Sequence, residues 1–239
     1  MHTMNPKPQL FLLHFAGGNG YSYNFLTPHL TTYFDVHVLE LPGRGKRINE
    51  PLIRDYALAV SDLYNQLISK RTEADYLIYG HSMGATLALA LTEKIEQEIQ
   101  PPLHIIVSGN PGPGIKDKRR YDIPKELFLQ ELKALGGMPN EFFENDELYH
   151  FFEPILRADF EVLEKDALVF TNCKIKAPIY AVMGNTEECA LQINNWQNYT
   201  SGLCQTTLLT GNHFFIHQYS KKLAAIIKNC YDRSKVLQY

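Results

Sequence analysis

Only four cysteines occur in the 239 residues, and no two of them form a C-x-x-C pair. Zinc sites and redox motifs use closely spaced cysteines, often with histidines at fixed distances, and no such spacing is present. Disulfide frameworks are typical of small secreted domains rather than of a chain of this length. We therefore expect no metal and four free, mostly buried thiols, at Cys173, Cys189, Cys204 and Cys230.

Long hydrophobic runs are also missing. No apolar stretch approaches the roughly 18 residues that a membrane-spanning helix needs. Residues Met1–Gln9 are polar, and the apolar run Leu10–Leu13 is too short for the core of a signal peptide. From these absences we expect a cytoplasmic protein that does not use a membrane.

The chain has no excess of basic residues, because 23 lysines and arginines stand against 26 aspartates and glutamates, for a formal charge of −3. Nucleic-acid-binding domains usually carry a strong basic surplus, so nucleic acid is not an expected partner. No heptad repeat predicts a coiled coil, and we expect a monomer. The hydrophobic fraction of 45% is that of an ordinary globular protein.

What is present is a series of short apolar runs that alternate with helical patterns. Short, fully apolar runs are typical of strands buried on both faces, as in a parallel sheet, and strand–helix alternation predicts an α/β fold with helices on both faces. The expected helices cover Ile53–Ile68, the segment from Ser82 to Ile99, and Ser220–Tyr231. The expected strands are Leu10–His14, Asp35–Leu39, Tyr76–Tyr79, Leu103–Val107, Ile179–Met183 and Thr206–Leu209.

One segment interrupts this alternation. About 70 residues separate Ser108 from Ile179, whereas a plain βαβ unit takes roughly 30. We predict a single domain over residues 1–239 with a helical lid inserted at about 112–174, where a structural subdomain without a gating role is the alternative. The helical patterns of this insertion are Lys125–Leu135, Glu141–Glu144 and Glu147–Leu168.

Residues Gly80–Gly84 read GHSMG, a G-x-S-x-G motif between a predicted strand and a predicted helix. In that setting the motif is typical of the nucleophile turn of the α/β-hydrolase fold, where the serine sits on a sharp strand-to-helix turn. Ser82 is therefore the predicted nucleophile. The N–H of Met83 lies at the start of the helix and is a predicted oxyanion donor. The competing interpretation is a glycine-flanked turn with an idle serine.

The loop after the first strand reads HFAGGNG over residues 14–20. Its glycines leave backbone N–H groups open to a ligand. We predict the second oxyanion donor to be the N–H of Ala16, with Phe15 next in order. A tight turn is expected at these residues whether or not they also hold an oxyanion.

The predicted general base is His213, which stands in GNHFF between the last strand and the last helix. His217 is the main rival, while His14 and His81 adjoin the site as lining residues. In this fold the triad acid lies between the nucleophile and the histidine along the chain, after strand Ile179–Met183.

The segment after that strand reads GNTEE and holds no aspartate, so Glu187 is the predicted acid and Glu188 the second choice. A glutamate can orient an imidazole as an aspartate does. Asp159 and Asp166 lie in the predicted lid and are interpreted as helix-surface residues.

Taken together, the motifs resemble those of the type II thioesterases associated with nonribosomal peptide and polyketide synthases, over nearly the whole chain. The blocks that carry the resemblance are HFAGG at 14–18, ELPGRGKR at 40–47, GHSMGA at 80–85, PILRADF at 154–160 and GNHFF at 211–215. The chain departs from the family pattern at Glu187 and at Asn212, where the family has aspartate, and the change at Asn212 is expected to matter less.

The resemblance implies a serine thioesterase that removes aberrant or stalled acyl units from the phosphopantetheine arm of acyl or peptidyl carrier proteins. The substrate carries the pantetheine, so the protein needs no cofactor of its own. Substrate contacts are expected from Phe15, Arg44, His81 and Phe214.

Two basic segments have alternative interpretations. In one interpretation, Arg44 or Arg47 contacts the phosphate of the arm. In the other, the arginine forms an internal ion pair, with Glu40 or Glu50. For the run Lys116–Arg120, one interpretation is a surface that attracts an acidic carrier protein, and the other is a solvated face with no partner. The competing functions are a small-molecule carboxylesterase or lipase with the same triad, and a non-catalytic binding protein.

Overall fold

The computed structural model describes residues 6–115, 118–165 and 171–236. Its centre is a six-stranded sheet in the order β2-β1-β3-β4-β5-β6, in which every neighbouring pair is parallel. Each expected strand is present, with ends that differ by at most two residues from the prediction, and the α/β-hydrolase fold is confirmed. The strands are β1 (Gln9–Leu13), β2 (Asp35–Leu39), β3 (Tyr76–His81), β4 (His104–Ser108), β5 (Ile179–Gly184) and β6 (Cys204–Leu209).

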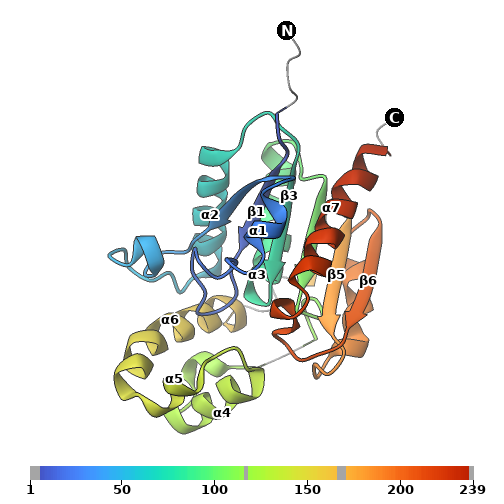
Figure 1. The fold of residues 1–239 in the computed structure, drawn as a ribbon. Helices are drawn as coiled ribbons and strands as arrows, with labels where there is room; N and C mark the ends of the chain where they lie inside the picture. Colours follow the sequence, from blue (N-terminus) through green and yellow to red (C-terminus); the bar gives the residue numbers. More distant parts are fainter. Residues whose placement is uncertain (1–5, 116–117, 166–170, 237–239) are drawn as a thin grey trace.

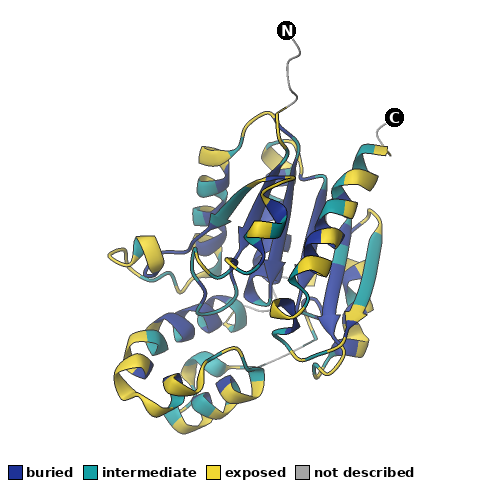
Figure 2. Ribbon diagram, viewed as in Figure 1, coloured by how far each residue is buried: buried dark blue, intermediate teal, exposed yellow. Residues whose placement is uncertain are grey.

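Helices cover both faces of this sheet (Figure 1). Alternate residues of each strand point to opposite faces, so Phe11 and Leu13 join one buried cluster and Leu10 and Leu12 the other. The first cluster packs under α2 (Tyr56–Lys70) and α3 (Met83–Glu98), the second under α1 (Thr27–Leu30) and α7 (Ser220–Val236). Figure 2 shows the result: the inner strands are dark and buried, the edge strands β2 and β6 are mostly half-buried, and the outer faces of the helices are exposed.

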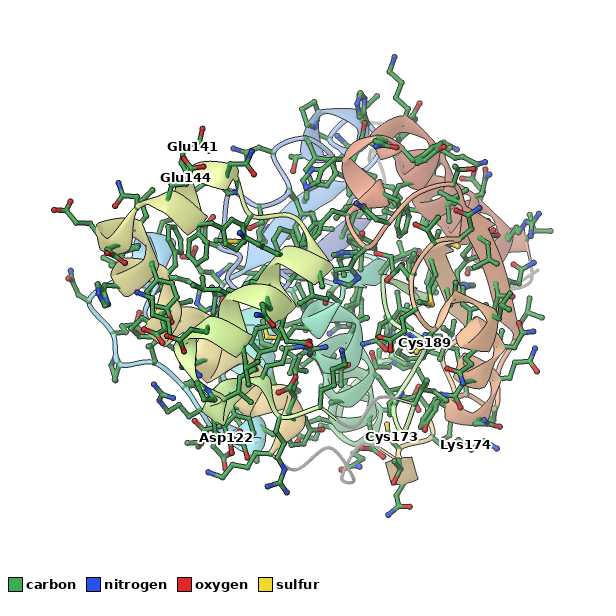
Figure 3. All side chains as sticks on the ribbon, turned by 90° about the horizontal axis from the view of Figure 1, so that it is seen from below. Asp122, Glu141, Glu144, Cys173, Lys174 and Cys189 are labelled. Atoms are coloured by element: carbon green, nitrogen blue, oxygen red, sulfur yellow. The ribbon has the colours of Figure 1, made fainter. Side chains whose placement is uncertain are left out.

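Three helices inserted between β4 and β5 form a separate layer with its own apolar cluster. They are α4 (Lys125–Leu135), α5 (Asn140–Glu144) and α6 (Asp146–Glu164), and the short helix η2 (Arg120–Asp122) precedes them. In Figure 1 this layer lies across the carboxyl end of the sheet, and Figure 3 shows Glu141 and Glu144 at its outer edge. We call α4–α6 the lid. The predicted helix end at Leu168 lies outside the described residues, as does Asp166.

The sequence did not predict η4 (Ala190–Tyr199), a 3₁₀ helix. Its buried residues Ala190, Ile193, Trp196 and Tyr199 recur every three residues, which is the period of a 3₁₀ helix rather than of an α-helix. Two further 3₁₀ turns are η1 (Gly45–Arg47) and η5 (Phe215–His217).

The four cysteines are free, Cys173 and Cys230 being buried and the other two half-buried. Within the described ranges, no group of histidine, cysteine and acidic side chains is arranged to hold a metal ion. Nor does any helix in those ranges have the length and apolar character to cross a membrane.

Candidate active site

Ser82 occupies the sharp turn between β3 and α3. Its φ of 55° makes it the one non-glycine residue with a positive φ in the described part of the chain. This strained conformation depends on close backbone contacts, because a Cβ at Gly80 would collide with the carbonyl of Gly84, and a Cβ at Gly84 with that of Leu13. The N–H of Ser82 donates to the carbonyl of Ser108 at 2.8 Å, which ties the turn to β4.

His213 and Glu187 lie in line with this serine. Nε2 of His213 is 3.0 Å from Oγ of Ser82, and Nδ1 is 2.7 Å from Oε2 of Glu187. The other oxygen of Glu187 accepts a hydrogen bond from the N–H of Gly184 at 2.8 Å. Glu188 points elsewhere, with a side chain 67% exposed, 3.8 Å from Nζ of Lys118. The structure therefore brings together the three residues that the sequence predicted as a triad, with the first-choice glutamate.

The loops that carry the acid and the histidine are joined to each other. The N–H of Gly211 donates to Oδ1 of Asn185 at 3.0 Å, and Oγ1 of Thr186 donates to the carbonyl of Gly211 at 2.8 Å. Oδ1 of Asn212 accepts from the N–H of Phe214 at 3.1 Å. An aspartate at position 212 would accept the same hydrogen bond, which supports the expectation that this departure matters little.

The loop after β1 is held by His14. Its Nδ1 lies 2.9 Å from the carbonyl of Phe15, and the N–H of Leu41 donates to its Nε2 at 3.2 Å. A carbonyl can only accept, so the proton is on Nδ1, and burial lowers the pKa of His14 to about 4, which keeps the ring neutral. The N–H of Gly18 donates to the same Phe15 carbonyl at 2.9 Å.

These hydrogen bonds orient the peptide between Phe15 and Ala16. In a trans peptide the N–H and C=O groups point in opposite directions, so the N–H of Ala16 points away from the fixed Phe15 carbonyl. Neither this N–H nor that of Met83 has an acceptor among the described residues. Both predicted oxyanion donors are thus open to a ligand.

Two pockets meet at Ser82 and His213. The first lies between the lid and the loop after β1, and its wall is largely apolar. Phe15, Ala16 and Phe214, three residues predicted for the site, line it from the side of the sheet. The lid contributes Leu132, Leu135, Met138, Leu156 and Phe160. We call this the apolar pocket.

The second, which we call the polar pocket, combines the polar side chains Asn110, Lys118, Arg120 and Glu164 with the apolar Leu135, Phe160 and Leu163. Nη1 of Arg120 lies 2.6 Å from Oε1 of Glu164, and burial raises the pKa of Glu164 to about 7 against the opposing effect of Arg120. Nδ2 of Asn110 donates to the carbonyl of Ser82 at 3.2 Å. Asn110 was not predicted from the sequence, although its place two residues after β4 puts it at the edge of the sheet that carries the site.

A model of the thioesterase domain matches residues 8–233. The chain belongs to the thioesterase family. Linear gramicidin dehydrogenase LgrE of Brevibacillus parabrevis is 29% identical over 95% of this chain and 89% of its own length. The medium-chain S-acyl fatty acid synthase thioesterase of Homo sapiens is 29% identical, over 89% of this chain and 83% of its own.

Among solved structures, ClbQ from the colibactin NRPS/PKS pathway is 26% identical, with a TM-score of 0.87 over 97% of this chain and 100% of ClbQ. The resemblance to type II thioesterases of nonribosomal peptide and polyketide pathways is confirmed, because homologues of this protein include such thioesterases. The protein is a hydrolase that acts on thioesters.

Two predicted substrate contacts of the thioesterase are wrong, and the first is His81. Its side chain is fully buried under the site, with its ring centroid 4.9 Å from that of His213. Nδ1 of His81 lies 2.9 Å from Oγ of Ser108, and burial holds its pKa well below the ordinary range. His81 lines neither pocket, and its ring packs against that of His213 instead. The rival base, His217, stacks on Phe214 and is not beside Ser82.

The second is Arg44, which the sequence placed in contact with substrate or in an ion pair with Glu40 or Glu50. Its side chain is 3% exposed, and its Nη1 and Nη2 lie 2.5 and 2.8 Å from the carboxylate of Asp159. The guanidinium is therefore not available to a phosphate. Asp159, interpreted from the sequence as a surface residue, is fully buried, with its charge paired to Arg44.

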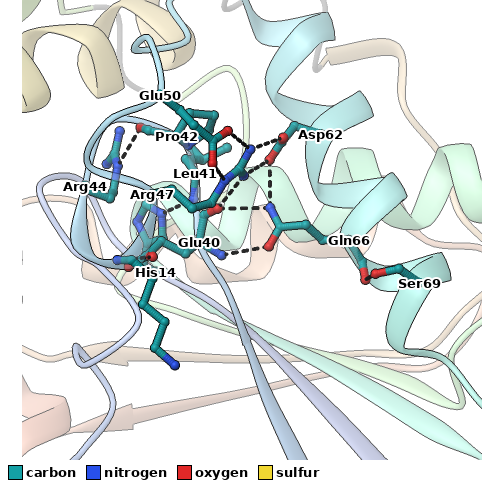
Figure 4. A network of polar contacts seen from close by, with 11 residues as sticks. His14, Glu40, Leu41, Pro42, Arg44, Arg47, Glu50, Asp62, Gln66 and Ser69 are labelled. Carbon is teal, nitrogen blue, oxygen red and sulfur yellow. Dashed lines mark hydrogen bonds and ion pairs between the residues drawn. The ribbon is translucent and has the colours of Figure 1, made fainter.

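The neighbouring Arg47 does form an internal pair. Its guanidinium contacts Glu50 at 2.5 Å and Asp62 at 2.7 Å (Figure 4). Glu40 organises the same loop through its carboxylate, which accepts from the N–H groups of Gly20 and Lys46 at 2.5 and 2.9 Å. Of the predicted docking run, Lys116 and Asp117 lie outside the described residues.

The rest of that run is divided between internal pairing and the surface. Lys118 contacts Glu131 at 3.1 Å, and Arg120 contacts both Glu131 and Glu164. Arg119 is exposed.

Proposed function

We propose that this thioesterase hydrolyses acyl groups from the phosphopantetheine arm of carrier proteins, and so removes aberrant or stalled acyl units in nonribosomal peptide or polyketide biosynthesis. One observation carries the proposal: the hydrogen-bonded line of Ser82, His213 and Glu187 lies where an apolar and a polar pocket meet. Its relatives in such pathways supply the substrate class.

In the first half of the proposed reaction, Oγ of Ser82 attacks the thioester carbonyl while Nε2 of His213 takes its proton. Glu187 stabilises the resulting imidazolium. The N–H groups of Ala16 and Met83 hold the oxyanion of the tetrahedral intermediate. Collapse breaks the carbon–sulfur bond, and the departing pantetheine sulfur takes the proton from His213.

In the second half, a water molecule gives a proton to His213 and attacks the ester carbonyl of the acyl-enzyme. A second tetrahedral intermediate uses the same two N–H groups. Its collapse returns the proton to Oγ of Ser82 and releases the carboxylic acid. The proton that leaves Ser82 departs with the pantetheine thiol, and the proton that leaves water restores the Ser82 hydroxyl, so the cycle needs no cofactor of the protein.

The two pockets suit the two parts of the substrate. The apolar pocket matches an acyl chain, whereas the pantetheine arm carries amides and a hydroxyl that suit the more polar lining of the second pocket. The lid supplies residues to both pockets, which supports its predicted role in controlling access. Carrier docking beside the exposed Arg119, a monomeric state and a cytoplasmic location belong to the same proposal.

The test compares an acyl-pantetheine thioester with the oxygen ester of the same acyl group, using the wild type and Ser82→Ala. We expect the thioester to have the higher kcat/KM, and Ser82→Ala to lose both this activity and labelling by a fluorophosphonate probe. Faster turnover of the oxygen ester would instead indicate a carboxylesterase. Absence of labelling in the wild type would indicate a non-catalytic protein.

A further inference from the structure

Two of the sequence blocks that carry the family resemblance have no part in the mechanism above, and they meet each other. Arg44 belongs to ELPGRGKR and Asp159 to PILRADF, 115 positions further along the chain. They form a buried, two-pronged ion pair between the loop after β2 and helix α6 of the lid. Buried pairs of this kind give little net stability over apolar residues of similar size, so stability alone is a weak reason for their presence.

Asp159 has a second partner, in the loop after β1. Its Oδ2 accepts a hydrogen bond from the N–H of Gly17 at 2.8 Å. Gly17 has a φ of +74° and no room for a side chain, because a Cβ there would lie 2.6 Å from Cδ2 of Leu156. One turn of α6 therefore packs directly on the residue that follows Ala16.

Both peptide groups that flank Ala16 are thus fixed. The carbonyl of Phe15 on one side is held by His14 and by the N–H of Gly18, while the N–H of Gly17 on the other side is held by Asp159. The first plane contains the N–H of Ala16, and the second restrains Ala16 from its other side, so both together hold this N–H in one direction. Oxyanion stabilisation depends on such orientation being present before the reaction starts.

We infer that Asp159, held in place by Arg44, is a positioning residue that aligns the oxyanion donor Ala16 and thereby couples the lid to catalysis. This inference rests on the proposed function. The coupling has a direct route, because Leu156 and Phe160 of the same helix line the apolar pocket. An acyl chain that packs against α6 therefore contacts the helix that sets the oxyanion hole.

The test uses two double variants, because removing Asp159 alone would leave Arg44 buried without a counter-charge. Arg44→Met/Asp159→Asn and Arg44→Met/Asp159→Leu both delete the ion pair, and asparagine and leucine have the same branching and the same number of side-chain heavy atoms. The difference that the test uses is that the asparagine can still accept the hydrogen bond from the N–H of Gly17, and the leucine cannot. Thermal unfolding of both variants checks that they fold to a similar extent.

The leucine variant is expected to have a kcat roughly 10- to 100-fold below that of the asparagine variant, with KM changed less than about threefold, as for a misaligned oxyanion donor. Hydrogen exchange in peptides covering residues 14–20 should be faster in the leucine variant. Equal kcat values and equal exchange in the two variants would overturn the inference. Because exchange needs no substrate, an inactive wild type would refute the proposed function and leave this part of the test decisive.

Discussion

Glu187 uses its two carboxylate oxygens for different partners: Oε2 lies 2.7 Å from Nδ1 of His213, and Oε1 accepts the N–H of Gly184 at 2.8 Å. Gly184 is the last residue of β5, so the carboxylate is fixed to the end of the sheet. A tight turn, in which the N–H of Glu187 donates to the carbonyl of Gly184 at 3.1 Å, brings the longer glutamate side chain back to that position.

We predict that Glu187→Gln lowers kcat by roughly 10³- to 10⁴-fold, because an amide neither stabilises the imidazolium nor enforces the tautomer of His213. Glu188→Gln is the matched control, since Glu188 stands next in the chain but points to Lys118. Its kcat should remain within about twofold of the wild type. Steady-state hydrolysis of an acyl-pantetheine measures both. A larger loss of kcat in Glu188→Gln than in Glu187→Gln would show that Glu188, and not Glu187, is the triad acid.

The apolar pocket should set the preferred chain length. Met138→Trp places a bulky ring in its wall and is expected to lower kcat/KM for octanoyl-pantetheine at least tenfold more than for acetyl-pantetheine, because the long chain loses its space. Leu127→Trp, on the exposed side of α4, is the control and should leave the ratio unchanged. If both chain lengths are affected equally by Met138→Trp, the chain does not bind in this pocket.

Acid sensitivity should depend on His104. Neither ring nitrogen of this buried residue has a hydrogen-bond partner among the described residues, and burial lowers its pKa to about 4. The unfolded chain takes up this proton near pH 6.5, whereas the folded protein does not until about pH 4, so falling pH favours unfolding.

His104→Leu should therefore remove about 3 kcal/mol of the stability lost between pH 7 and pH 4. Urea unfolding at a series of pH values measures this difference between the two proteins. His14, whose pKa is also about 4, remains in the variant, so the variant still loses some stability at low pH. Parallel curves for the wild type and the variant would show that His104 does not titrate in this way.

Carrier docking should respond to the exposed Arg119. Arg119→Glu is expected to raise KM for an acyl carrier protein several-fold, because acidic carriers are then repelled, with little change for the free acyl-pantetheine. Lys70→Glu makes the same charge change at the far end of α2, where it should have no effect. Equal effects of Arg119→Glu on both substrates would mean that the residue acts on the active site and not on docking.

The sequence predicts well those features whose signal is local. The nucleophile turn is one of them, because the two glycines of G-x-S-x-G, Gly80 and Gly84, stand where any side chain would collide with backbone atoms. Glu187 and His213 are others, since each follows a strand whose apolar run marks its end. Parallel strands bring all their carboxyl ends to one edge, which assembles these three residues.

Features that depend on tertiary contacts are not predictable in this way. Arg44 and Asp159 each resemble ordinary surface charges within their own segments, and only the folded chain shows that they pair across 115 positions. For His81 a usable signal was present. Side chains alternate along a strand, so His81 points to the same side of β3 as the buried Tyr79.

The central claim is that Ser82 releases acyl groups from a carrier-bound thioester. Intact-protein mass spectrometry of an acyl-loaded carrier protein, incubated with the wild type or with Ser82→Ala, tests it most directly. We expect the carrier to lose the acyl mass and keep its pantetheine arm with the wild type, and to remain loaded with Ser82→Ala. An acyl group that survives both enzymes, while the wild type cleaves a small ester, would show that carrier-bound thioesters are not the substrate.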